Sequence, residues 1–374
     1  MALGFRSWRL ALTAIITIAI MLLGIIWDRT GSNTVGSATG GQKTVSIYGE
    51  VENIFNLRVQ ALISGDTTAL ANYYDNTETT GRWALNHEIG RTKYLHEWLG
   101  KRNLELMGSE LQVRIVDAGL RTDTQAWASV SQHLILRYRK RSLPPSQVSQ
   151  MGLRTIHWVE LIHKDNKWLI QKDWYWDPLE ADDLVPDIAA LPPESLSPTA
   201  LGAERKGKYN REAAVLYADR YSGVRLGSGD GRYNPAYKDF TYEGGDCANF
   251  ASQVLTDKQA GGIPTDGAWF YSQGKGTKAW VQAEALVYHL IYSGLAVLIK
   301  RGNFQEVSGV INYLDRGDII GYEEKGEIVH VSIVVGKDAG GYVVVDSHTA
   351  DRYHVPWDMG WEKKHLYWLL HITY

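Results

Sequence analysis

The chain has 374 residues, of which 44% are hydrophobic and 22% are charged, and its formal net charge is −3. This length exceeds one ordinary domain and fits two, and the hydrophobic fraction is ample for packed cores. The weakly acidic balance provides no basic field for nucleic acid, so we expect no nucleic-acid partner. The chain has 14 Trp and 21 Tyr residues. Such residues occur both in cores and in ligand clefts, so their number does not distinguish a binding function from ordinary packing.

The N-terminal part contains an apolar segment. Residues 10–27 are 18 uncharged, mostly apolar positions, and Arg6 and Arg9 precede them. The segment is long enough to span a membrane and longer than most signal-peptide cores. Positive charge before the segment favours an N-terminus inside and a C-terminus outside the cell. We therefore expect residues 1–43 to be a signal anchor with a linker. Cleavage of a signal peptide, followed by secretion, is the alternative.

Residues 44–179 are predicted to form a separate α+β domain. Hydrophobic spacing predicts helices first and strands afterwards. The helices are expected over residues 47–63, 67–74 and 83–106, and the strands over residues 111–118, 124–139, 151–164 and 167–176. This order resembles the cone of the nuclear-transport-factor-two-like fold.

Such cones usually offer a pocket, and Trp83, His87, His133 and His157 are candidates to line it. The spacing does not assign these residues to a pocket, and a structural or docking domain is the favoured interpretation. Residues 180–208, rich in Pro, Leu, Ser and acidic residues, are predicted to link this domain to the next one.

The single cysteine stands in a distinctive context. Cys247 follows Gly244, Gly245 and Asp246, and residues 248–255 have the apolar spacing of a helix. The glycines allow a sharp turn, and Asp is a favoured N-cap residue. A cysteine in a first helical turn meets unpaired N–H groups and the helix dipole, which favour the thiolate. A buried structural cysteine is the alternative.

The polar residues that a thiolate needs follow downstream. His330 lies in a β-branched run over residues 327–336, which predicts a strand between strands at residues 316–322 and 341–349. Asp346 and His348 share one face of the last strand because side chains alternate along a strand. Either could orient the His330 imidazole, as a nucleophile–base pair requires.

Structural roles and metal binding are the alternatives for these residues. His330, Asp346 and His348 on adjacent strands could hold zinc. No helical His-Glu-x-x-His motif and no paired Cys supports this interpretation, so we expect neither a metal nor another cofactor.

Residues 209–374 resemble the bacterial putative amidase family, a branch of the papain-like cysteine hydrolases related to the NlpC-type and CHAP cell-wall enzymes. The order of a Cys on a helix, a His on a strand and a polar residue on the next strand also matches that superfamily. The matching strings are Tyr209-Asn210-Arg211-Glu212-Ala213-Ala214, Gly244-Gly245-Asp246-Cys247-Ala248-Asn249-Phe250, Gly317-Asp318-Ile319, His330, and Ser347-His348-Thr349. The expected class is α+β, with a helix bearing Cys packed on an antiparallel sheet bearing His.

The resemblance implies a role for each residue. Cys247 is the nucleophile, and His330 is the general base and later the acid for the leaving amine. His348, or else Asp346, fixes the His330 tautomer. The Cys247 backbone N–H forms part of an oxyanion hole.

Three further residues are candidates for substrate contacts. Asp246 is expected mainly to cap the helix, and Asn249 could contribute polar contacts near the helix start. Trp269 is a candidate for a cleft wall because it lies in a loop.

The sequence therefore predicts a membrane-anchored bacterial amidase or peptidase that faces the outside of the cell and hydrolyses an amide bond, with peptidoglycan as the expected partner. An inactive papain-like module that binds peptidoglycan or a surface partner is the alternative from another class. A thioester-forming transferase would use the same nucleophile, and the sequence does not separate it from a hydrolase.

Overall fold

The computed structural model describes residues 38–179, 208–229, 231–361 and 365–374. The predicted membrane segment at residues 10–27 lies outside the described residues, as does nearly all of the predicted linker. Among the residues that are described, no helix has both the length and the hydropathy needed to cross a membrane. The chain divides into two units, Met1–Val45 and Ser46–Tyr374, and the architecture below is that of the second unit.

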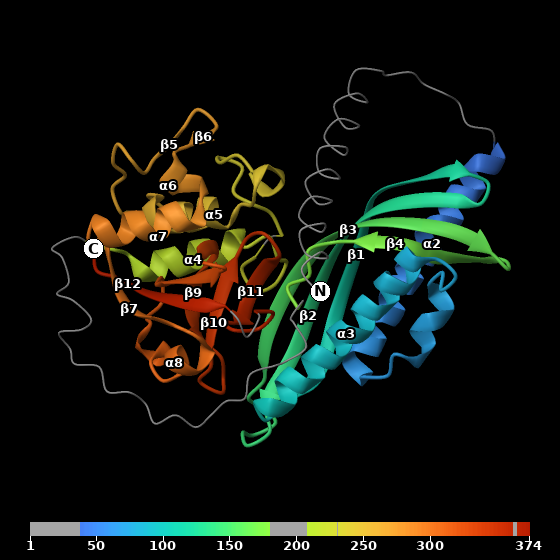
Figure 1. The fold of residues 1–374 in the computed structure, drawn as a ribbon, viewed down its shortest axis with the longest axis horizontal. Coiled ribbons are helices and arrows are strands. Elements are labelled where there is room, and N and C mark those ends of the chain that lie inside the picture. The colour runs from blue at the N-terminus through green and yellow to red at the C-terminus, as the bar shows by residue number, and fades with distance from the viewer. Residues whose placement is uncertain (1–37, 180–207, 230, 362–364) are drawn as a thin grey trace, which may run out of the picture. The chain divides into compact units, whose positions relative to one another are not determined.

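A mixed α+β fold on an antiparallel sheet is confirmed (Figure 1). Ten strands join in one sheet with the order β1-β2-β3-β11-β10-β9-β8-β12-β7, and β4 pairs with β3. The strands are β1 (Leu104–Thr122), β2 (Gln125–Lys140), β3 (Ser149–Lys164), β4 (Lys167–Trp174), β7 (Ala296–Gly302), β8 (Ile319–Glu324), β9 (Glu327–Lys337), β10 (Val343–Ser347), β11 (Asp351–Pro356) and β12 (Leu366–Ile372). A separate small sheet pairs β5 (Tyr271–Ser272) with β6 (Lys275–Gly276).

The N-terminal half of this unit has its helices before its strands, as predicted. Helix α2 (Ala38–Ser64), the 3₁₀ helix η1 (Thr68–Tyr73) and α3 (Thr79–Lys101) precede β1. The prediction of a helix to residue 106 is wrong at its end. Asn103 adopts a left-handed conformation with φ of 54°, which ends the helix and lets β1 begin at Leu104.

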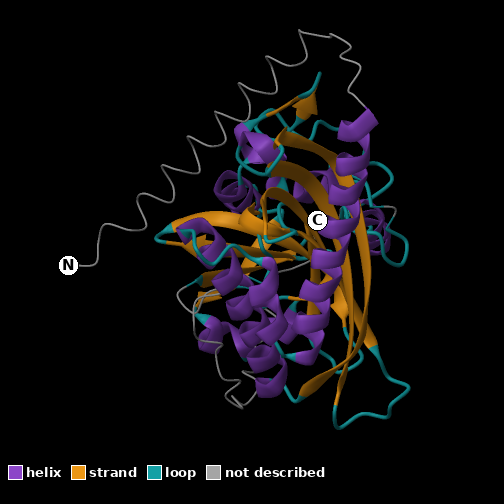
Figure 2. Cartoon of the chain, turned by 90° about the vertical axis from the view of Figure 1, so that its right-hand side faces the viewer, coloured by secondary structure: helices purple, strands orange, loops and turns teal. Residues whose placement is uncertain are grey.

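The C-terminal half places helices on both faces of its strands. Helices α4 (Arg211–Tyr221), α5 (Cys247–Thr256) and α7 (Ala283–Tyr292) pack against β9 (Figure 1). The short α8 (Phe304–Ser308) packs against β7 and β12. Gln282 separates the short helix α6 (Lys278–Val281) from α7. Figure 2 shows helices in purple against the orange strands.

Strands β3 and β11 join the two halves into one sheet. Asp351, Arg352 and Tyr353 pair with Arg154, Leu153 and Gly152, respectively. Gly152 is needed here because a Cβ at this position would lie 2.6 Å from a methyl carbon of Val224. The sequence predicts two domains joined by a linker, and it gives no sign of β11 or of this pairing. The exact domain boundaries stay a prediction.

A buried ion pair reinforces the junction. Arg102, at the C-terminal cap of α3, pairs with Asp358, which follows β11, and both side chains are 1% exposed. Asp358 also accepts hydrogen bonds from Trp98 Nε1 at 3.3 Å and from the Tyr342 hydroxyl at 2.9 Å. One carboxylate therefore satisfies three donors from α3, its C-cap and the start of β10.

Replacement of Asp358 by Ala should destabilise the chain by about 3–5 kcal/mol, because it leaves the buried Arg102 charge unpaired. Denaturant unfolding followed by circular dichroism measures this change. Glu110→Ala is the matched control: Glu110 pairs with Arg137 on the surface and is 57% exposed, so its loss should cost about 0–1 kcal/mol. Equal effects of the two substitutions would contradict a buried junction.

Candidate active site

The turn before Cys247 has the geometry that the sequence predicts. Gly244 and Gly245 have φ angles of 116° and 113°, a region that side chains disfavour. Asp246 occupies the N-cap position, and Cys247 is the first residue of α5. The prediction that the thiol stands at a helix N-terminus is therefore confirmed.

The thiol environment differs from the prediction. Cys247 is only 7% exposed, and burial raises the pKa of its thiol to about 11. The backbone N–H of Val331 donates to the sulfur and opposes this shift, whereas the charge of Asp246 adds to it. The amides at the helix start also lower the pKa, but desolvation outweighs them. The prediction of a favoured thiolate is wrong for this conformation.

Asp246 organises the start of α5 without capping it. Its side chain makes no hydrogen bond to the helix backbone, so the predicted cap is wrong. One carboxylate oxygen accepts from the Phe240 backbone N–H at 2.7 Å and from Asn249 Nδ2 at 2.9 Å. The other oxygen lies 2.6 Å from His348 Nδ1. Asp246 thus ties the preceding loop, α5 and the end of β10 together.

His348 is held between acceptors and rings. Its Nε2 lies 2.6 Å from the Tyr221 carbonyl oxygen, while Nδ1 faces the Asp246 carboxylate. The ring stacks on Tyr233 with centroids 3.6 Å apart and on Phe250 with centroids 4.0 Å apart. Both nitrogens therefore face acceptor oxygens. Neither nitrogen is free to orient His330.

A polar chain leads from His348 to the sheet junction. The Tyr233 hydroxyl donates to Asp351 at 2.6 Å, and Arg154 Nη1 donates to the same carboxylate at 2.9 Å. Asp351 opens β11, and Arg154 is its partner on β3. The N-terminal half therefore contributes Arg154 to the surroundings of His348.

His330 lies on the other face of its strand from the thiol. Its ring is 4.9 Å from the Trp361 ring and 5.6 Å from the Tyr322 ring, whereas Val331 shares a core cluster with Cys247. Side chains alternate along a strand, so His330 and Val331 point to opposite faces. No hydrogen bond joins Cys247 to His330 in the described chain, and His330 Nε2 is buried without a partner. The structure does not bring the predicted nucleophile and base together.

Asp346 also lies away from His330. It does share one face of the sheet with His348, as strand alternation predicts, and α4 and α5 pack on this face. Asp346 lies there beside Asp219 of α4 and His354 of β11. Its Oδ1 accepts from the His354 backbone N–H at 2.7 Å. Neither candidate for a residue that orients His330 has that role in this conformation. The zinc set of His330, Asp346 and His348 is not assembled either.

The remaining substrate-binding candidates are buried. Trp269 is 0% exposed, and its Nε1 donates to Ser252 at 2.9 Å. Asn249 accepts from Trp280 Nε1 at 2.7 Å and donates to the Lys238 carbonyl at 3.0 Å. The prediction of a cleft wall at Trp269 is wrong, because the loop around this residue folds its ring into the core.

Sequence reasoning missed several residues of the site. Tyr221, Tyr233, Asp351 and Arg154 surround His348 through contacts between residues far apart in the chain. Only Tyr233 carried a signal, as one of three tyrosines in the loop before the cysteine. The Asp351 contact needed the β3–β11 register, which no local pattern predicts.

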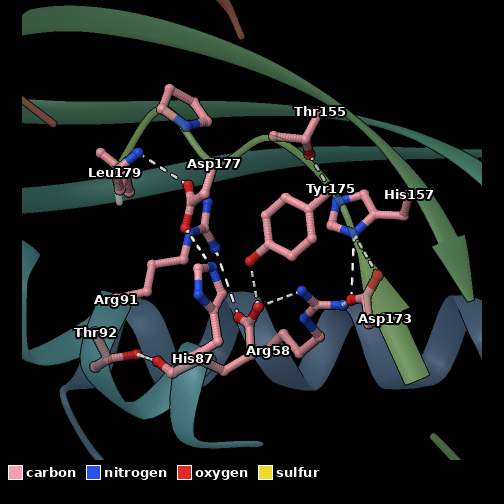
Figure 3. A network of polar contacts seen from close by, with 12 residues as sticks. Arg58, His87, Arg91, Thr92, Thr155, His157, Asp173, Tyr175, Asp177 and Leu179 are labelled. Carbon is pink, nitrogen blue, oxygen red and sulfur yellow. Dashed lines mark hydrogen bonds and ion pairs between the residues drawn. The ribbon is translucent and has the colours of Figure 1, made fainter. Parts of the chain in front are cut away.

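Two of the four candidate pocket residues, His87 and His157, belong to a polar network in the N-terminal half instead (Figure 3). His157 contacts Asp173 at 3.1 Å and Thr155 at 2.8 Å, and burial lowers its pKa although Asp173 opposes the shift. His87 lies 3.0 Å from Asp177. The same network contains the pairs Arg58–Glu88, Arg58–Asp173 and Arg91–Asp177.

These contacts tie α2, α3 and β4 to one another, so the network serves the structure of this half. Of the other two candidates, Trp83 is 64% exposed, and His133 accepts a hydrogen bond from the Arg225 backbone N–H at 3.3 Å.

The C-terminal half is similar to a known protein family. Residues 208–370 match the model of the family described as "Putative amidase domain". This match confirms the resemblance of residues 209–374 to the putative amidase family. It supports a hydrolase that acts on amides, and the α+β domain that bears Cys247 is the matched part.

The chain is also similar to the uncharacterized protein YhbB of Bacillus subtilis (strain 168), at 32% identity over 155 residues. That alignment covers 39% of this chain and 43% of the length of YhbB.

Two solved structures were also found. The intermembrane space region of the chloroplast protein ARC6 matches with a TM-score of 0.27 and 11% identity, covering 35% of this chain and 95% of that one. A protein titled putative scytalone dehydratase from Novosphingobium aromaticivorans DSM 12444 matches with a TM-score of 0.25 and 15% identity. This match covers 35% of this chain and 83% of that one. At these scores neither likeness bears on the fold or the function.

The buried His330 should make the fold sensitive to acid. Burial, with Arg352 nearby, lowers its pKa to about 3, so between pH 6.5 and 5 only the unfolded chain takes up a proton at this residue. This linkage should reduce the free energy of unfolding by about 2 kcal/mol as the pH falls over that range. Denaturant titrations at several pH values should give a smaller loss for His330→Gln than for the wild type. The same loss in both proteins would show that His330 titrates normally.

Proposed function

We propose that the chain is a cysteine amidase that hydrolyses an amide bond of cell-wall peptide outside the bacterial cell. One observation carries the proposal: the single cysteine is the first residue of α5, in a domain that matches an amidase family. Residues 10–27 would anchor the chain in the membrane with the catalytic domain outside, or would direct its secretion. As part of this proposal, the C-terminal half has a papain-like fold and the N-terminal half has the cone of the nuclear-transport-factor-two-like fold.

In the proposed reaction, Cys247 Sγ attacks the carbonyl carbon of the amide, and its proton passes to His330. The imidazolium then gives this proton to the leaving amine as the C–N bond breaks, which leaves a thioester. Water activated by the same imidazole hydrolyses the thioester, releases a carboxylate and restores the thiol. The Cys247 backbone N–H contributes to the oxyanion hole.

The resting arrangement supports His330 over His348 as the base. The His330 Nε2 atom has no hydrogen-bond partner among the described residues, so it is free to take up a new one. Burial lowers the pKa of the ring to about 3, so the proposed reaction requires a change of surroundings that raises this pKa before the ring can act as the base. The residue next to it, Val331, already contacts the thiol. His348 has both nitrogens against acceptors, so we assign it a positioning role for Asp246 and the start of α5.

Catalysis then requires a local rearrangement. The pairing of β8 with β9 is irregular where Tyr322 faces His330 and Glu323 faces Ile328, which leaves Val329 as an extra residue in β9. Such bulges re-aim side chains beside active sites. We propose that substrate binding shifts this bulge and turns His330 toward Cys247.

A binding module is the second candidate, because one observation favours it. Among the described residues the buried thiol has no imidazole partner, and its pKa is raised, as expected of a domain that no longer catalyses a reaction. Such a module would bind peptidoglycan or a surface partner without turnover.

The two functions are separated by incubating the full chain with purified peptidoglycan fragments and following new carboxylate and amine ends by mass spectrometry. Cys247→Ser should abolish turnover, and His330→Ala should reduce it by about 10²–10⁴-fold. His163→Gln, in β3 and outside the proposed site, is the matched control and should keep full activity.

Full activity of the Cys247→Ser variant would contradict the thiol mechanism. Binding of the fragments by the wild type without any new ends would establish the binding module instead.

A further inference from the structure

A second polar cluster lies behind the proposed site. Asp219 of α4, Asp346 of β10 and His354 of β11 each present one potential ligand atom, and these atoms all lie within 4.8 Å of one another. The three residues come from three elements and are separated by up to 135 positions. Their proximity is a product of the fold and not of a local run of acidic residues.

The chain holds these side chains in place by specific means. His354 has a φ angle of 51°, a left-handed conformation that costs a non-glycine residue free energy and that the surroundings must impose. Its ring Nε2 lies 2.9 Å from Asp219 Oδ1, and its backbone N–H donates to Asp346 Oδ1. The imidazole and both carboxylates therefore lie close enough together to share one ion.

The second oxygen of Asp346 points to a ligand. Asp346 is 0% exposed, and among the described residues no N–H or O–H group donates a hydrogen bond to its Oδ2, although the Asp219 carboxylate lies nearby. A buried carboxylate oxygen without a partner is costly, and a second carboxylate nearby adds repulsion. Either a proton or a cation must compensate this charge.

We propose that Asp219, Asp346 and His354 bind a divalent first-row metal ion, with Zn²⁺ as the best match. One imidazole nitrogen and two carboxylate oxygens are ligands that Zn²⁺ accepts, with water in the fourth position. Mg²⁺ and Ca²⁺ prefer oxygen ligands alone, so they fit this set less well. The His354 side chain is 34% exposed and that of Asp219 is 13% exposed, which leaves an approach for the ion and its water.

The ion would stabilise the elements that surround Cys247. Asp219 lies two residues before Tyr221, whose carbonyl holds His348, and Asp346 lies two residues before His348 itself. A metal that ties α4 to β10 and β11 fixes both ends of that hydrogen bond. The inference concerns stability and does not depend on the proposed amidase activity.

The test is calorimetric titration of Zn²⁺, Mn²⁺ and Mg²⁺ into the chelator-treated full chain. The Cys247→Ser background is used so that the single thiol cannot bind the metal. We expect one Zn²⁺ per chain and weak or no Mg²⁺ binding. Asp346→Asn and His354→Gln should each weaken Zn²⁺ binding by at least about 100-fold. His163→Gln should leave the binding unchanged.

The unfolding temperature is a second measurement, which keeps the proposal testable if one of these variants does not fold. Zn²⁺ should raise the unfolding temperature of the parent, and Asp219→Asn, at the partly exposed side of the cluster, should reduce this rise. The proposal is overturned if the parent binds no Zn²⁺, or if its binding survives both Asp346→Asn and His354→Gln. Asp346 would then be neutralised by a proton shared with Asp219.

Discussion

The pairing of β3 with β11 is the constraint on which the rest of the structure depends. It turns two halves with separate sequence patterns into one antiparallel sheet. The pair Arg154–Asp351 lies at this junction and extends through Tyr233 to the ring of His348. The buried pair of Arg102 and Asp358 secures the other side. An ion pair with both members buried is costly to break, so the halves are expected to unfold together.

This constraint explains the state of the site. His348 is stacked between two rings and hydrogen-bonded at both nitrogens, so it acts as part of the scaffold that fixes Asp246 and the start of α5. Cys247 is consequently well placed but buried, and desolvation dominates the helix-terminal amides in setting its pKa. His330 lies on the face of β9 opposite to the one that contacts Cys247. Its ring is neutral, and its Nε2 has no partner among the described residues. In the proposed function, the nucleophile and the base are therefore separate from each other at rest.

The sequence was informative where the signal is local. The two glycines, the N-cap position of Asp246 and the start of α5 at Cys247 follow from residue types within four positions, and the strand around His330 follows from β-branched residues. The face of that strand was not predictable, because a bulge at Val329 shifts the alternation. The partners of His348 and the cluster of Asp219, Asp346 and His354 depend on tertiary contacts. Trp269 was misplaced for the same reason, since loop position says nothing of which way a large ring folds.

The most direct test of this account is the rate of Cys247 alkylation as a function of pH in the full chain, for the wild type and for His330→Ala. With one cysteine in the sequence, every modification reports on this thiol. The account predicts a slow reaction at neutral pH, a thiol that titrates near pKa about 11, and no effect of His330→Ala. A thiol that titrates below the ordinary value of about 8.5 and loses this property in the His330 variant would contradict it. That result would mean that Cys247 and His330 form a pair in the resting protein.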